Sequence, residues 1–281
     1  MRLNLGCSFE YRGETETAAV VLVEPHSDLA GTVEAARWDE DPLETYLDVY
    51  GNLCRRFILP VGPSRFRYSA TVRVSSEPEA MPGREDVQRR VEDLPAGMLH
   101  WLLPSRLCES DSLVDRAWEL FGRTPMGAER VQAVCDWIHG TIEYGVASVP
   151  TTTAAETLDC AGGMCRDFAH LGITFSRALG IPARYVSGYI ADVGVPGPFP
   201  PMDFHAWFEV WLGSQWWTFD ARYNVPRMGR VPVGRGRDAV DVAMVTTYGD
   251  ARLERMKVWA DEIAVDEGAE FAPSGSTRGG L

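Results

Sequence analysis

The first part of the chain alternates between apolar and polar positions, as half-buried β-strands do. One face of the segment LNLGCSFEY carries Leu3, Leu5, Cys7 and Phe9, and the segment FRYSATVRV has the same period of two. The segment DVYGNLCRRFIL places a Gly-Asn turn between two apolar runs, which predicts a hairpin. Because several short strands occur here without a helix-length pattern, we predict a β-sandwich domain over residues 1–78.

The periodicity changes beyond a polar, proline-containing stretch, SSEPEAMPGREDVQ, which predicts a linker over residues 79–110. The segments SLVDRAWELFG and AERVQAVCDWIHGTI then carry apolar residues at helical spacing. A further helix is predicted from near Cys165 to Leu179, because Gly180 is a typical C-terminal stop and Pro182 follows just beyond it.

Strand patterns return after these helices, in the segments ARYVSGYI, FHAWFEVWL and QWWTFDA. The stretch ADVGVPGPFPPMD, between the first two, predicts a loop. Helices followed by antiparallel strands are typical of an α+β domain, in which the helices pack on an antiparallel sheet. We place this core at residues 111–265 and predict a flexible tail over residues 266–281.

Charge and composition exclude several classes of partner. The net charge is −13, so the chain would repel a phosphate backbone or an anionic membrane surface, and we expect neither nucleic acid nor a membrane as a partner. The first residues contain no apolar leader segment, and no run of about 18 apolar residues occurs along the chain. We therefore expect a cytoplasmic location.

The cysteines have neither the pattern of a metal site nor that of a disulfide framework. They are scattered, without a CxxC pair or a cysteine–histidine cluster at zinc spacing, so we expect no metal and no other cofactor. Without an export signal, disulfides are not expected either. The six are Cys7, Cys54, Cys108, Cys135, Cys160 and Cys165.

One of these cysteines has the surroundings of a nucleophile. In the stretch CAGGMCRDFAHLG, Gly162 and Gly163 interrupt the chain, so that a helix can begin at or next to Cys165 and the backbone can approach a substrate closely. A helix N-terminus stabilises the thiolate, which is the attacking form, and the N–H of Cys165 could hold an oxyanion. Cys160 precedes the glycines and gains none of this. The alternative is that Cys165 is a packed, unreactive cysteine.

A cysteine nucleophile also needs a base, normally a histidine that is held by a third polar group. His170 is unsuited, because five residues turn a helix by about 500° and its side chain would point away from that of Cys165. His205 opens the strand FHAWFEVWL directly after the proline-rich loop, where it can reach a cleft. Asp220 ends the strand QWWTFD, and the sharp turn LGSQ would bring its carboxylate beside His205. The alternative for Asp220 alone is a turn residue.

Three blocks of the sequence together resemble a known family. The chain resembles the transglutaminase-like superfamily, in its bacterial transglutaminase-like cysteine protease branch, in the blocks GGMCRDFAHLGITFSRALGIPARYVSGY, DFHAWFEVW and WWTFDARYN. Cys165 and His205 are 40 residues apart, and His205 and Asp220 are 15 apart. The segment GRGRDAVDVAMVTTYG and the N-terminal β region are also similar to this branch. One departure is Ala221, where the family more often has a proline after the aspartate.

The resemblance implies an N-terminal β-sandwich followed by a papain-like transglutaminase core. It implies that Cys165 is the nucleophile, His205 the base and Asp220 the orienting carboxylate. The acidic calcium-binding loops of animal transglutaminases have no counterpart in this chain, so calcium dependence does not carry over. Tyr144 is a candidate second oxyanion donor, from its place upstream of the nucleophile.

These residues predict acyl transfer from the amide bonds of a peptide or protein, through a thioester on Cys165. Hydrolysis by a peptidase or amidase is the favoured outcome, because water is the ubiquitous acceptor and no segment marks a lysine-binding site. Two alternatives stay open: protein-glutamine transglutaminase activity, and a catalytically silent scaffold that binds peptides in the same cleft. The oligomeric state stays open as well. Arg166 and Asp167, beside the nucleophile, are expected to form a structural ion pair.

Overall fold

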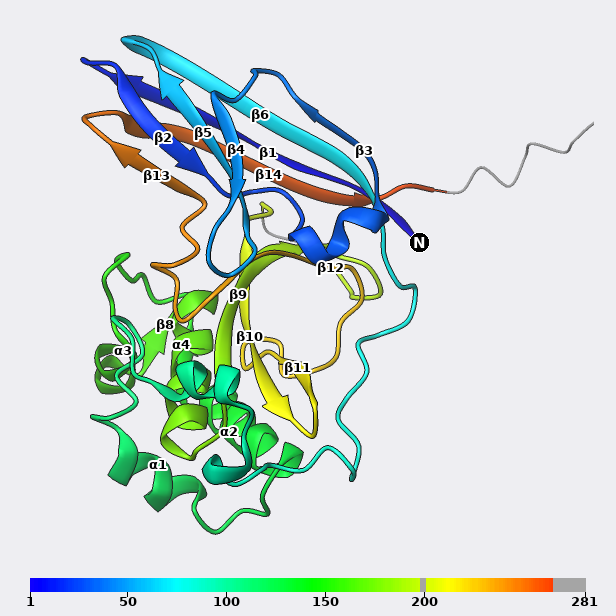
Figure 1. The fold of residues 1–281 in the computed structure, drawn as a ribbon, viewed down its shortest axis with the longest axis vertical. Coiled ribbons are helices and arrows are strands. Elements are labelled where there is room, and N and C mark those ends of the chain that lie inside the picture. Colours follow the sequence, from blue (N-terminus) through cyan, green and yellow to red (C-terminus); the bar gives the residue numbers. More distant parts are fainter. Residues whose placement is uncertain (198–200, 265–281) are drawn as a thin grey trace, which may run out of the picture.

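The computed structural model describes residues 1–197 and 201–264, and it has two parts (Figure 1). A β-sandwich occupies the upper part of the view, and helices packed on a second β-structure occupy the lower part. This α+β architecture with a β-rich N-terminal region is the one predicted from the pattern of apolar positions.

The sandwich consists of two four-stranded antiparallel sheets that face each other across an apolar core. The predicted strand faces are correct, since Leu3, Leu5 and Phe9 are buried in this core. The predicted hairpin is also present, and Gly51 adopts a φ of 81° in its turn, a value that glycine reaches without strain. In sheet order, the strands are β14 (Arg252–Glu262), β1 (Arg2–Gly13), β6 (Gly62–Arg73) and β3 (Val33–Trp38), then β13 (Val245–Tyr248), β2 (Thr17–Val21), β5 (Leu53–Leu59) and β4 (Glu44–Leu47).

The two ends of the described chain meet in the sandwich, which departs from the predicted division into domains. β14 pairs with β1 along its length, and β13 pairs with β2, although both strands fall within the range 111–265 predicted for the core. Only Val258 and Ala260 are buried in β14, so its own pattern carries little information about the sheet it joins. The other predicted boundaries stay predictions, and the predicted tail over 266–281 lies outside the described residues.

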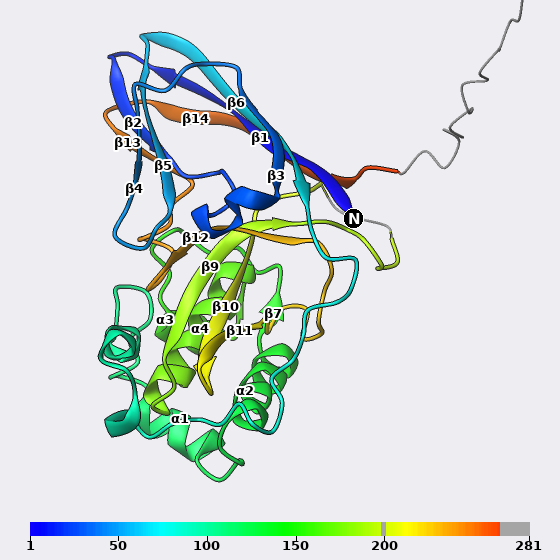
Figure 2. The ribbon, with the colours of Figure 1, turned by 45° about the vertical axis from the view of Figure 1, so that its right-hand side comes forward.

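In the core, helices pack on one another and against an antiparallel sheet with the strand order β11-β10-β9-β12 (Figure 2). The central helix, α4, lies directly on β10, where Gly172 lets the ring of Phe208 approach the helix backbone. The elements are α1 (Val114–Phe121), α2 (Ala128–Thr141), α3 (Ala154–Cys160), α4 (Cys165–Ala178), β9 (Ala183–Ile190), β10 (His205–Leu212), β11 (Gln215–Phe219) and β12 (Arg230–Gly236), with a short parallel pair β7 (Glu143–Tyr144) and β8 (Gly162–Gly163).

The segment between β6 and α1 runs along the side of the core (Figure 1). Side-chain hydrogen bonds connect it to the core. The side chain of Gln88 donates to the carbonyl of Leu179 at 2.9 Å, and Arg89 Nε donates to the carbonyl of Gly213 at 2.7 Å. Short 3-10 helices occur here as η2 (Val91–Asp93) and η3 (Ala96–Leu102), and η1 (Ser27–Thr32) lies in the sandwich part.

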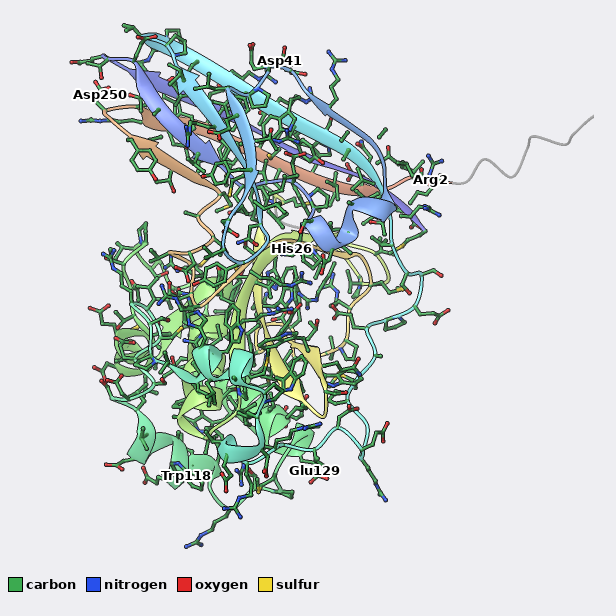
Figure 3. The ribbon with its side chains drawn as sticks, in the orientation of Figure 1. Arg2, His26, Asp41, Trp118, Glu129 and Asp250 are labelled. Atoms are coloured by element: carbon green, nitrogen blue, oxygen red, sulfur yellow. The ribbon has the colours of Figure 1, made fainter. Side chains whose placement is uncertain are left out.

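The sandwich and the core share a continuous apolar cluster, which fixes one part against the other. The hydroxyl of Tyr189, on β9, donates to the carbonyl of Val23 at 2.9 Å, and both residues are fully buried. His26 lies at this junction (Figure 3), where its backbone N–H donates a hydrogen bond to the carbonyl of Pro232 at 2.8 Å. No helix within the described residues is long and apolar enough to cross a membrane.

Candidate active site

Cys165 is the first residue of α4, as predicted. Because it begins the helix, its N–H has no acceptor within the helix, and the positive end of the macrodipole lies at the sulfur. The carboxylate of Asp167 accepts a hydrogen bond from the N–H of Met164 at 2.8 Å, which fixes the start of the helix. The side chain of Cys165 is partly exposed, so a substrate can reach it.

The glycine pair before Cys165 has a packing role that the sequence did not indicate. Gly162 and Gly163 form strand β8 and are buried, and neither has a positive φ. A Cβ on Gly162 would lie 2.6 Å from the side chain of Val146, and one on Gly163 would lie 2.7 Å from Cβ of Asp167. The glycines therefore let three segments pack closely around the start of α4.

His205 and Asp220 come together on the β10–β11 hairpin, as the turn between the two strands predicts. The register pairs Phe208 with Phe219, so the start of β10 lies beside the end of β11. His205 Nε2 lies 2.8 Å from Asp220 Oδ2, and both side chains are buried. Since Nε2 is engaged by the carboxylate, Nδ1 is the ring nitrogen that remains for Cys165, whose sulfur is among the nearby groups that raise the pKa of His205.

Each oxygen of the Asp220 carboxylate accepts two hydrogen bonds. Oδ1 accepts from the backbone N–H groups of Arg222 at 2.9 Å and Tyr223 at 3.2 Å. Oδ2 accepts from Arg230 Nη2 at 2.6 Å in addition to its bond with His205. Burial alone would raise the pKa of Asp220, but the charges of His205 and Arg230 hold it below its usual range, so the group stays ionised.

The same pair determines the charge of the imidazole. Burial alone would lower the pKa of His205, but the charge and hydrogen bond of Asp220, aided by the sulfur of Cys165, raise it to about 9. His205 is therefore an imidazolium at neutral pH. An imidazolium beside a cysteine at a helix N-terminus is the arrangement that activates a thiol for nucleophilic attack.

Tyr144 and Arg222 form one wall beside this centre. The guanidinium of Arg222 stacks on the ring of Tyr144 at 3.7 Å, and the ring of Tyr223 lies 5.0 Å from that of His205. Burial, together with the charge of nearby Cys165, raises the pKa of Tyr144, so its hydroxyl remains a hydrogen-bond donor at neutral pH. Its role as a second oxyanion donor stays a prediction.

Other residues near the nucleophile have structural surroundings. His170 is fully buried and its Nε2 accepts a hydrogen bond from the N–H of Ala239 at 3.2 Å, while burial lowers its pKa to about 4. Arg166 and Asp167 form the expected ion pair at 3.0 Å. Cys160 is exposed on α3. No group of three or more His, Cys, Asp or Glu side chains in the described part of the chain is placed to hold a metal ion.

Two charged residues behind Asp220 were not expected from the sequence. Arg230 opens strand β12, and Glu79 lies in the segment predicted as a linker. A charged residue at the end of a strand or in a polar linker is normally exposed, so no local signal marks either one. Only the pairing of β12 with β9 brings Arg230 beside the hairpin.

A cysteine at a helix N-terminus, facing a histidine and a carboxylate on an antiparallel sheet, is the geometry of papain-like cysteine enzymes. A family model described as the transglutaminase-like superfamily matches residues 116–221. A crystal structure described as that of a "putative cysteine protease" from Cytophaga hutchinsonii has a TM-score of 0.82 and 30% sequence identity, over 95% of this chain and 92% of that one. The chain therefore belongs to the transglutaminase-like superfamily, and its fold is that of a papain-like cysteine enzyme.

Curated relatives match a shorter part of the chain. An uncharacterized protein from Mycobacterium leprae is 36% identical over 121 residues, which are 40% of this chain and 42% of that protein. An uncharacterized protein from Mycobacterium tuberculosis is 38% identical over 115 residues, 37% of each chain. The matches thus span about two fifths of the length of these relatives.

Proposed function

We propose that this protein is a cysteine-dependent enzyme that transfers acyl groups from the amide bonds of peptides or proteins, mostly to water. Cys165 is the nucleophile, His205 the general acid and base, and Asp220 the group that orients His205. The observation that carries the proposal is the buried His205–Asp220 pair at 2.8 Å, which lies beside the sulfur at the start of α4.

The reaction follows from the charges of the three groups. The Cys165 thiolate attacks the amide carbonyl, and the oxyanion that forms is stabilised by the backbone N–H at the helix N-terminus. The His205 imidazolium gives its proton to the departing amine, which leaves a thioester on Cys165 and a neutral imidazole. Neutral His205 then takes a proton from a water molecule, whose oxygen attacks the thioester; the C–S bond breaks, the acid is released, and the Cys165 thiolate and the His205 imidazolium are restored.

The acyl acceptor distinguishes hydrolysis from transglutamination, because the first half of the reaction is common to both. We favour hydrolysis, since water reaches any exposed thioester. A catalytically silent scaffold that binds peptides is the third candidate. A binding protein has no need of an ionised histidine held against a partly exposed cysteine, so we rank it below the two enzymes.

Alkylation tests the nucleophile without a known substrate. Iodoacetamide at mildly acidic pH should label Cys165 faster than any other cysteine. Cys160 is the matched control, because it is exposed and only five residues away, whereas Cys7, Cys54 and Cys108 are buried. Labelling of Cys160 and Cys165 at equal rates would contradict the proposal. Cys165→Ala should lower the turnover of any substrate by several orders of magnitude.

Trapping tests the acceptor. Peptide amides are incubated with the protein and hydroxylamine, in the presence or absence of a lysine-like amine. A hydroxamate formed by the wild type but not by Cys165→Ala would report the thioester. Incorporation of the amine in preference to hydrolysis would favour transglutaminase activity, and neither product from any peptide would favour the silent scaffold.

A further inference from the structure

A row of alternating charges continues from the candidate active site into the protein, on the side of Asp220 away from Cys165. Asp220 Oδ2 lies 2.8 Å from His205 Nε2 and 2.6 Å from Arg230 Nη2. Arg230 Nε then lies 2.9 Å from a carboxylate oxygen of Glu79. The side chain of Arg230 is only 4% exposed and that of Glu79 is 24% exposed, so water screens these charges weakly.

Arg230 and His205 share one oxygen of the carboxylate. The other oxygen is occupied by the N–H groups of Arg222 and Tyr223, so neither partner of Oδ2 can move to it. A cation at 2.6 Å draws electron density and charge away from the hydrogen bond with the imidazolium. The guanidinium of Arg230 is also stacked on Trp207, at 4.8 Å from the ring centroid, which holds it in place.

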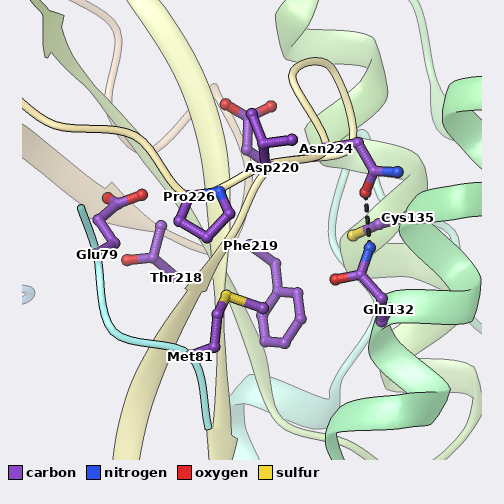
Figure 4. A pocket seen from close by; sticks show the side chains of 10 residues that line it. Glu79, Met81, Gln132, Cys135, Thr218, Phe219, Asp220, Asn224 and Pro226 are labelled. Carbon is purple, nitrogen blue, oxygen red and sulfur yellow. Dashed lines mark hydrogen bonds between the residues drawn. The ribbon is translucent and has the colours of Figure 1, made fainter. Parts of the chain in front are cut away.

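Glu79 comes from a different part of the chain and opposes Arg230. Its N–H donates to the carbonyl of Arg227 at 3.2 Å, and its carboxylate accepts from the N–H of Arg227 at 3.3 Å. Glu79 and Asp220 line the same small pocket of about 30 Å³ (Figure 4). Burial raises the pKa of Glu79, while the charge of Arg230 opposes that rise; the ionised Glu79 carboxylate offsets part of the positive charge that Arg230 presents to Asp220.

We propose that Arg230 and Glu79 are positioning residues with opposite effects on the base. Arg230 weakens the interaction between the Asp220 carboxylate and the protonated imidazole of His205, and Glu79 strengthens it. This inference rests on the proposed function only in naming His205 as the base. The titratable or charged groups around the His205–Asp220 pair are Cys165 on α4, Cys135 on α2, Tyr144 on β7, Arg222 and Tyr223 after β11, Arg227 just before β12, Arg230 at the start of β12, and Glu79 from the linker.

The sign of the effect gives the test. The titration of His205 is followed by NMR on protein carrying 15N-labelled histidine, with the signal assigned by its loss in His205→Gln. Arg230→Gln removes a nearby positive charge and should move the titration upward by about one pH unit or more. Glu79→Gln removes a nearby negative charge and should move it downward by a smaller amount.

Kinetics provide a second readout once a substrate is known. The alkaline limb of the pH profile of kcat/KM should move to higher pH in Arg230→Gln and to lower pH in Glu79→Gln, because acylation needs the imidazolium. A residue that only stabilised the fold would lower the amplitude of the profile without moving it. Arg230→Lys retains the positive charge and should restore most of the wild-type titration.

Arg184→Gln is the matched control, because it breaks another largely buried ion pair of the same sheet, between Arg184 and Glu209 at 2.6 Å, and should leave the titration of His205 unchanged. The inference is overturned if the two test variants move His205 in the same direction, or if neither moves it. If Arg230→Gln does not fold, the titration of His205 in Glu79→Gln tests the proposal alone: a downward shift supports it, and its absence overturns it. Slow alkylation of wild-type Cys165 would overturn the proposed function, whereas the NMR titration would still decide the opposed effects of Arg230 and Glu79.

Discussion

The His205–Asp220 pair predicts how the stability of the protein changes with pH. The pKa of His205 rises from 6.5 to about 9 on folding, since the Asp220 charge overcomes the effect of burial. A group whose pKa is raised on folding contributes stability that is fully present below its unfolded pKa and is lost as the pH rises through its folded pKa. The rise of about 2.5 pH units corresponds to about 3 kcal/mol, which should be lost between pH 6.5 and 9.

Urea denaturation at a series of pH values measures this contribution. The free energy of unfolding of the wild type, minus that of His205→Gln, should fall by about 3 kcal/mol between pH 6 and 9.5. Titrating groups that do not interact with His205 are common to both proteins and cancel in the difference, which therefore reports His205 and its two partners, Asp220 and Cys165. His100→Gln, which removes an exposed histidine of η3, should retain the fall. Parallel curves for the wild type and His205→Gln would refute the reasoning.

Two further predictions concern packing and the junction of the two parts. Gly172→Ala should lower the free energy of unfolding by about 1–3 kcal/mol, because its Cβ would lie 2.4 Å from the ring of Phe208. Gly140→Ala, on α2 with open space around it, should instead raise it by about 0.5–1 kcal/mol, and equal effects at both glycines would contradict the packing argument. Tyr189→Phe should cost about 1–3 kcal/mol, because it leaves the carbonyl of Val23 buried without its donor, and an unchanged urea midpoint would argue against this bond.

The parts of the fold that were predicted from the sequence have local signals. The start of α4 at Cys165 and its end before Gly180 follow from glycines that flank a helical pattern. The approach of His205 to Asp220 follows from strand alternation and a sharp turn, because a hairpin fixes which residues lie opposite each other. The catalytic roles of these residues remain predictions until Cys165 is tested.

The features that the sequence did not reveal depend on contacts between distant segments. Arg230 and Glu79 meet Asp220 only because β12 pairs with β9 and the linker lies against the hairpin. Neither periodicity nor composition specifies such pairings, since a charged side chain has the same local pattern whether it faces water or a buried carboxylate. The cytoplasmic location and the exact division into domains also stay predictions.

The pairing of β1 with β14 has a consequence for how the protein is made. During synthesis on the ribosome, the chain emerges from its N-terminus, so α4 and the β10–β11 hairpin leave before β14. Until β14 arrives, β1 has one partner, β6, and an open edge. The sandwich is thus the first part to begin and the last to be completed. A nascent chain that stalls after β12 would carry an assembled catalytic hairpin beside an exposed strand edge, and that intermediate is the one that should need a chaperone.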